Sequence, residues 1–213
     1  KFGPVSIEKA ISFEITKPLK ELEPEVEQLI DGKTYTVNNK LRRYRHDNPN
    51  ALPLGDDPIW QKQKESHYSR APIQNWEGLN SSAQPLDPSG AAGPNHYVQA
   101  INTRLVVYNK TGVVQYGPTN LSTLLGGSND GDPIVMYDKA ADRWFLAQFG
   151  TSTDKKIYIA VSTSNNPMGS YYTYTYVSPQ FPDYLKFCVW QDGYYMTSNQ
   201  STQKVFAFER TAM

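Results

Sequence analysis

The stretch DPIVMYDKAADRWFLAQF (residues 132–149) decides how this chain can fold. It contains two short runs of branched and aromatic residues, typical of strands, separated by the turn-forming Lys-Ala-Ala-Asp. The same pattern recurs in YLKFCVWQDGYYMTSN (residues 184–199), and a similar stretch occurs earlier, in GPNHYVQAIN (residues 93–102). A strand pattern that recurs at a nearly fixed interval indicates a repeat architecture.

The three versions align residue by residue. Three aromatic residues, Tyr97, Trp144 and Tyr194, occupy the same place and are spaced 47 and 50 residues apart. The strands that follow them also match, as RLVVYNK, KIYIAVS and KVFAFER. Periods of this size with four strands per unit are typical of β-propeller blades. The alternative interpretation is a plain β-sandwich in which the spacing of the aromatic residues is coincidental.

We therefore predict an all-β chain of propeller blades, each a four-stranded antiparallel sheet, with units at about residues 76–125, 126–178 and 179–213. The middle unit, residues 132–177, supplies all four strands. The third unit ends at Met213 after its third strand, whereas propellers close with four to eight blades. We expect the propeller to be incomplete in this chain and to be completed by a longer chain or by a partner chain.

Residues 1–74 differ from residues 75–213. They are charged, interrupted by proline and without a sustained period, which predicts an extended N-terminal arm or a small pre-domain. Within them SIEKAISFEI (residues 6–15) fits either a strand or a frayed helix. The chain begins at Lys1 with no signal peptide, so we expect a processed or trimmed product.

The composition argues against two classes of partner. With 21 basic and 21 acidic residues the formal net charge is zero, so no overall field favours nucleic acid. No apolar window is long enough for a membrane-spanning helix, so we expect no membrane insertion. The single cysteine, Cys188, cannot form an internal disulfide. Because it lies in the strand-like run KFCVW, we expect it to be a small buried apolar residue.

The segments NWEGLNSSAQPLDPSGAAGPNHYVQAIN, LVVYNKTGVVQYGP, NDGDPIVMYDKAADRWFLAQF and KFCVWQDGYYMTSNQSTQKVFAFER together resemble a group of large secreted bacterial β-propeller proteins abundant in Bacteroidota. The resemblance covers about residues 75–213. Many proteins of that group end in a type IX secretion sorting domain, so the resemblance implies a secreted or cell-surface location. The chain departs from the group's acidic loop at LDPSGAAGPN: Asp87 matches the first acid, but Ala91 or Ala92 replaces the second.

The acidic loop GGSNDGDP offers the best candidate ligands for a metal. Asn129, Asp130 and Asp132 alternate with flexible residues and present oxygens of the kind that Ca²⁺ prefers. The loop lacks the spacing of an EF-hand. Ordinary turn chemistry, in which Asn and Asp bond their own backbone beside Gly131, explains the same residues.

The sequence predicts no catalytic or cofactor-binding residue. A propeller glycosidase of the sialidase type would need an arginine cluster, whereas Arg104 and Arg143 stand alone, and no Asp-box is present. The three histidines lack metal-ligand spacing. We interpret His96 as structural because it heads a strand at the position that Arg143 and Gly193 hold in the other units.

We expect a binding or scaffold module whose partner is a protein or a glycan, since tyrosine-rich rims suit both. A protein partner would complete the propeller or hold the N-terminal arm. Two alternatives stay open: a glycoside hydrolase or lyase whose active site lies in blades not present here, and a subunit or passenger of a bacterial secretion or surface assembly.

Overall fold

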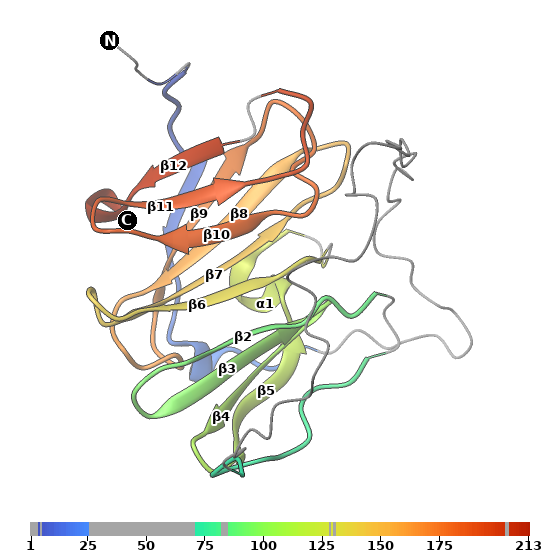
Figure 1. The fold of residues 1–213 in the computed structure, drawn as a ribbon, viewed down its shortest axis with the longest axis vertical. Helices are drawn as coiled ribbons and strands as arrows, with labels where there is room; N and C mark the ends of the chain where they lie inside the picture. Colours follow the sequence, from blue (N-terminus) through green and yellow to red (C-terminus); the bar gives the residue numbers. More distant parts are fainter. Residues whose placement is uncertain are drawn as a thin grey trace, which may run out of the picture.

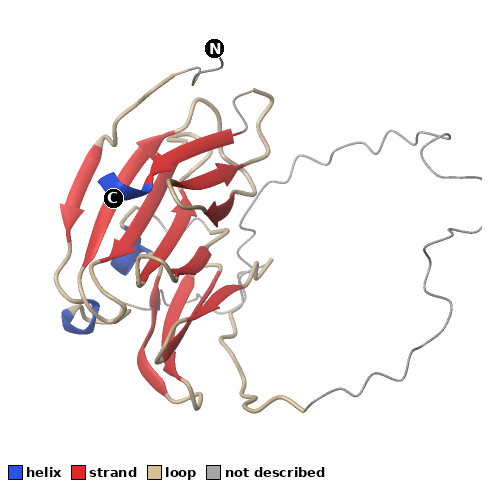
Figure 2. Ribbon diagram, turned by 60° about the vertical axis from the view of Figure 1, so that its left-hand side comes forward, coloured by secondary structure: helices blue, strands red, loops and turns tan. Residues whose placement is uncertain are grey.

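The computed structural model describes residues 4, 6–25, 71–81, 85–127, 129, 131–202 and 205–213. These residues form antiparallel sheets joined by turns and very short helical segments (Figures 1 and 2). The prediction of an all-β chain is confirmed. Of the predicted N-terminal arm, residues 26–70 lie outside the described part of the chain.

The described strands make three sheets. Sheet 1 has the order β2 (Ser89–Ala92), β3 (His96–Ile101), β4 (Arg104–Asn109) and β5 (Val114–Asn120). Sheet 2 has the order β1 (Ser12–Ile15), β9 (Tyr171–Val177), β8 (Lys156–Ser162), β7 (Arg143–Phe149) and β6 (Ile134–Asp138). Sheet 3 has the order β10 (Lys186–Val189), β11 (Gly193–Thr197) and β12 (Val205–Glu209). The helical segments are η1 (Leu19–Glu21), α1 (Ser122–Leu125) and η2 (Arg210–Ala212).

The three sheets repeat one pairing register. The first three strands of each sheet align a row of facing residues, and these rows are Ala91–Val98–Val107, Met136–Phe145–Val161 and Cys188–Tyr195–Ala207. We call the face that carries each row the forward face of its sheet. As predicted, β3, β7 and β11 begin at His96, Arg143 and Gly193. The repeat inferred from sequence is thus a repeat of strand pairing.

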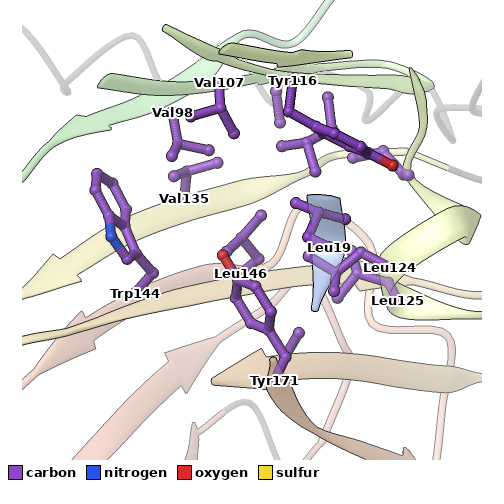
Figure 3. Close-up of a cluster of buried hydrophobic side chains, with 14 of the residues drawn as sticks. Leu19, Val98, Val107, Tyr116, Leu124, Leu125, Val135, Trp144, Leu146 and Tyr171 are labelled. Atoms are coloured by element: carbon purple, nitrogen blue, oxygen red, sulfur yellow. The ribbon is translucent and has the colours of Figure 1, made fainter. Parts of the chain in front are cut away.

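Sheet 2 lies between the other two sheets and is buried on both faces (Figure 1). The forward face of sheet 1 packs against the rear face of sheet 2, where Trp144 is fully buried (Figure 3). The forward face of sheet 2, with Phe145, packs against Tyr194 on the rear face of sheet 3, their ring centroids 4.6 Å apart. Trp144 and Phe145 therefore lie in different gaps between sheets, because neighbouring residues of a strand point to opposite faces.

The start of the chain runs along the outer edges of two sheets. Strand β1 pairs antiparallel with β9 and makes a fifth strand in sheet 2. Leu19 then enters the core between sheets 1 and 2, where it is fully buried. The backbone N–H of Glu25 donates to Thr119 Oγ1 at 3.0 Å, and its carbonyl accepts from the N–H of Asn120 at 2.6 Å. This segment ties the outermost strands of both sheets together.

One expectation about burial is wrong. Cys188 is exposed, because it belongs to the forward face of sheet 3. Within the described part of the chain no further sheet covers that face. The equivalent residues of sheets 1 and 2, Ala91 and Met136, contact the core of the following interface.

Candidate functional site

The first strands of the three sheets begin in the same unusual backbone conformation. Asp87, Asp132 and Tyr184 each lie two residues before the first strand and have φ of 39°, 45° and 54°. Aspartate tolerates this left-handed region better than most residues. The N–H of Asn102 donates to Leu86 O, and the N–H of Asn199 donates to Asp183 O, both at 2.8 Å, so sheets 1 and 3 share the same closing bond.

Three of these polar residues join sheet 1 to sheet 2. Asn102 is fully buried, and its Nδ2 donates to Asp87 Oδ2 at 3.0 Å. Its Oδ1 accepts the backbone N–H of Asp132 at 2.7 Å. With Asp183, which acts electrostatically on Asp132, we call these residues the acidic junction. The buried amide fixes the two aspartates beside each other, since each of its polar ends is satisfied by one of them.

Electrostatics make Asp132 unusual. Burial, then a hydrogen bond with the Asp87 side chain and the charges of Asp87 and Asp183, raise the pKa of Asp132 to about 7, against the opposing charge of Lys186. Asp132 is only 3% exposed. Burial and the neighbouring negative charges therefore both favour the protonated form of Asp132. Chemically, the acidic junction can hold a proton near neutral pH, or a cation in its place.

The predicted metal ligands have different surroundings. Asn129 Oδ1 accepts the backbone N–H of Ser122 at 2.8 Å and so satisfies a donor in the first turn of α1. Asp132 belongs to the acidic junction, and Asp130 lies outside the described residues. Among the residues that the structure describes, no three His, Cys, Asp or Glu side chains are grouped to hold a metal ion. Calcium binding by this loop stays a prediction.

A second polar cluster lies between sheets 2 and 3, at the C-terminal end of β6. Asp138 accepts from Arg210 Nη2 at 2.9 Å, from Arg210 Nε at 2.5 Å and from the Tyr194 hydroxyl at 2.9 Å. Burial alone would raise the pKa of Asp138, but bonds from Arg210, Ala141 and Tyr194 hold it below its ordinary value. Because its charge is satisfied within the fold, we assign this cluster a structural role.

Two residues considered in the sequence are structural as well. Arg143 donates to the Tyr194 hydroxyl and to the carbonyls of Arg210 and Met213, at 3.1, 2.7 and 2.8 Å. It therefore anchors the residues after β12 rather than a substrate. Burial and the charge of Lys110 lower the pKa of His96, which favours a neutral imidazole at the start of β3.

The forward face of sheet 3 is the kind of exposed apolar face that a stack of sheets leaves where its repeat stops. Its central row, Cys188, Tyr195 and Ala207, has no sheet over it among the described residues. Large apolar side chains stand exposed around it: Trp190 is 69% and Val205 is 70% exposed. The alternation of VFAFE gave a signal, since it requires one face of β12 to differ from the other.

Comparisons with known proteins do not assign the chain. A scan against protein-family models finds no match, and a search of curated proteins finds none either. Within the described residues no helix is long and apolar enough to cross a membrane. The function of the chain must therefore be inferred from its residues and their geometry.

Proposed function

We propose that this chain forms blades of a β-propeller that acts as a binding or scaffold module for a protein or a glycan, in a secreted or cell-surface protein. Its completion comes from a longer chain or from a partner chain. The location rests on the resemblance described for residues 75–213. The architecture rests on the shared register of the three sheets, which is the pattern that stacked repeats require.

Burial of both faces of sheet 2 supports blades over a sandwich. A two-sheet sandwich buries one face of each sheet. Here Trp144 and Phe145, adjacent in β7, are both fully buried, one in each of two separate cores. The middle sheet of a stack has this property, and so does every blade of a propeller.

One observation carries the binding role. The forward faces of sheets 1 and 2 are buried by the next sheet, but the equivalent face of sheet 3 is exposed with Trp190 and Val205 upon it. Exposed apolar surface of this kind marks a contact with another macromolecule or another domain. A scaffold whose last described sheet has an uncovered face is suited to assembly with another sheet or another protein.

The intact protein on a glycan array and in partner capture tests this proposal. We expect saturable binding of a glycan or a protein without release of reducing ends. We also expect the variant Val205→Asp to lose capture of a protein that covers sheet 3, and the control Ile73→Asp, whose side chain is 96% exposed elsewhere, to keep it. Released reducing ends would point to the hydrolase or lyase. Capture that depended only on residues 1–74 would point to the secretion or surface assembly.

A further inference from the structure

The outer edge of sheet 3 differs from the outer edges of sheets 1 and 2. In sheet 1 the third strand, β4, pairs with β5, and in sheet 2 the third strand, β8, pairs with β9. Among the described strands, β12 pairs with β11 alone. No described strand takes the position beside β12 that a fourth strand takes in the other two sheets, and we call it the open position.

The backbone of β12 presents hydrogen-bonding groups to this open position. The N–H of Arg210 donates to Asp192 O at 3.2 Å, one step beyond the pair Gly193 and Glu209. Bonding alternates along an antiparallel pair, so the N–H and C=O groups of Val205, Ala207 and Glu209 point away from β11. A row of such groups is a template for another strand.

An apolar surface lies below the open position. A run of rings leads outward from β12 across sheet 2: Phe208 to Tyr176 at 5.0 Å, Tyr176 to Tyr174 at 6.5 Å, and Tyr174 to Phe13 at 5.1 Å between centroids. Phe13 pairs with Tyr174 in register, so it lies on the forward face of sheet 2, toward sheet 3. In Figure 1, β12 crosses in front of sheet 2, with β1 running beyond β9.

We call the β1 part of this surface the apolar shelf: Ile11, Phe13 and Ile15. These side chains are 61%, 54% and 61% exposed, although two of them belong to a paired strand. Their polar neighbours Ser12 and Glu14 occupy the other face of β1. A strand placed beside β12 would cover the shelf with every second side chain, because strand residues alternate between faces.

We propose that the edge of β12 and the apolar shelf accept an extended strand of a partner polypeptide. The strand runs antiparallel to β12, as β5 and β9 do to their neighbours. Every second side chain of the strand is apolar and packs on the shelf around Phe13. Hydrogen bonds to the backbone of β12 give affinity, and contacts with the apolar shelf select strands with apolar side chains at alternate positions. The inference rests on the proposed binding role and deepens it by naming a polypeptide strand as the partner.

The chain itself supports this kind of partner. Strand β1 already adds to the edge of β9 over four residue pairs, so an added strand is compatible with an outer edge of this stack. The residues after β12 turn away from the open edge: η2 follows at once, Arg143 holds the carbonyls of Arg210 and Met213, and Met213 is buried in the core between sheets 2 and 3. Residues 210–213 therefore do not occupy the position beside β12.

Binding of a labelled strand peptide to the 213-residue chain tests the inference. The probe is the chain's own fourth strand of sheet 2, GSYYTYTYVS (residues 169–178), with a fluorescein at its N-terminus. We expect a saturable rise in fluorescence anisotropy. A control peptide with both threonines replaced by proline removes two backbone donors and should give no saturable signal.

Two variants separate edge binding from adhesion to apolar surface. Ala207→Pro removes an outward N–H, so a carbonyl of the bound peptide loses its donor, and the affinity for the peptide should fall by about tenfold or more. Ala207→Ser keeps this N–H and should bind the peptide with normal affinity. Phe13→Ser should weaken it by about fivefold through lost apolar contact, and Ser12→Ala, on the opposite face, should not. Circular dichroism establishes that each variant is folded.

Two results would overturn the inference: no saturable binding to the unmodified chain, or binding that neither Ala207→Pro nor Phe13→Ser weakens. Failure of the wider proposal is distinguishable from these. If the intact protein still captures its partner through Val205 while the peptide does not bind, the strand-accepting edge alone is wrong. If peptide binding is present but the intact protein captures neither protein nor glycan, the proposed role is wrong.

Discussion

At Asp132, one carboxyl group couples the stability of the junction between sheets 1 and 2 to pH. Its pKa of about 7 in the fold exceeds the ordinary value of 3.8. Below about pH 4 the group is protonated both in the folded and in the unfolded chain, so it carries no penalty. As pH rises from about 4 to about 7, the unfolded chain releases the proton while the fold retains it, and the free energy of unfolding decreases.

We predict that Asp132→Asn is more stable than the unmodified chain at pH 8. The amide cannot ionise and tolerates the positive φ of this position. It therefore escapes the cost of burying a charge and, after that, the repulsion from Asp87 and Asp183, and the gain should be at least about 1.4 kcal/mol, the equivalent of one pKa unit. Urea unfolding at pH 5 and pH 8 measures it. Equal pH dependence in the two proteins would disprove the role of Asp132.

The same pair of proteins tests the calcium prediction. A cation held by the acidic loop would favour ionised Asp132, so calcium should raise the unfolding midpoint of the unmodified chain at pH 8. The Asn variant should respond less. No shift in either protein would leave Asp132 as a group that holds a proton and would remove the metal prediction.

Gly93 shows how a single missing side chain allows two sheets to approach. A Cβ atom at this position would lie 2.5 Å from Cζ2 of Trp144, across the gap between sheets 1 and 2. We predict that Gly93→Ala costs about 1–3 kcal/mol, the usual cost of overpacking. The matched control is Gly169→Ala, where the nearest atom is a backbone oxygen 3.2 Å away. Thermal unfolding of the two variants should separate them, and equal midpoints would contradict the contact.

Among the elements, strands with strong local preference could be predicted from the sequence. The branched and aromatic runs that become β3, β4 and β6 to β12 fit a pleated, half-buried surface. Strand β2, Ser89–Ala92, was not predicted, because its small residues have weak strand preference. They are suited to close contacts: a Cβ on Gly90 would lie 2.3 Å from the Tyr97 hydroxyl. Strand β1 remained ambiguous because its pairing depends on β9, far away in sequence.

The candidate site was predictable only in part. Asp132 stood out in the sequence as a candidate metal ligand and Asp87 as a match to the resembling group's acidic loop, but Asn102, which joins them, did not stand out. Its role depends on register: it follows β3 in a tight turn and meets Asp132 from the next sheet. The unpaired edge of β12 follows from a third unit with three strands, which the sequence predicts. The apolar shelf beside it depends on the pairing of β1 with β9, so no local pattern could identify the shelf.

The element that ties the first two sheets is the segment from β1 to Glu25. Leu19 is fully buried between sheets 1 and 2, far in sequence from every strand that surrounds it. We predict that Leu19→Ala costs about 2–5 kcal/mol, as for other buried leucines. Ile7→Ala, at a position 86% exposed, should cost almost nothing. Urea unfolding compares them, and a small effect of Leu19→Ala would mean that this segment contributes little to the core.

In the whole described molecule, one pairing register runs through three sheets, and the forward faces of sheets 1 and 2 are each covered by the next sheet. Of the aromatic positions spaced 47 and 50 residues apart, Trp144 fills the gap between sheets 1 and 2 and Tyr194 the gap between sheets 2 and 3. Tyr97 lies on the rear face of sheet 1, against Trp76 and Tyr108. Sheet 3 repeats the register but leaves its forward row, Cys188, Tyr195 and Ala207, without a covering sheet in the described chain. Cys188 was expected to be buried, and a further layer would bury it.

The most direct test is the thiol reactivity of Cys188, the single cysteine of these 213 residues. It is measured by alkylation and mass spectrometry in the 213-residue chain and in the intact protein isolated from its source cells with its partners. We predict rapid labelling in the chain alone and strong protection in the natural assembly, where the proposed further sheet would cover the forward face. Equally rapid labelling in both would contradict the account, since sheet 3 would then end the stack.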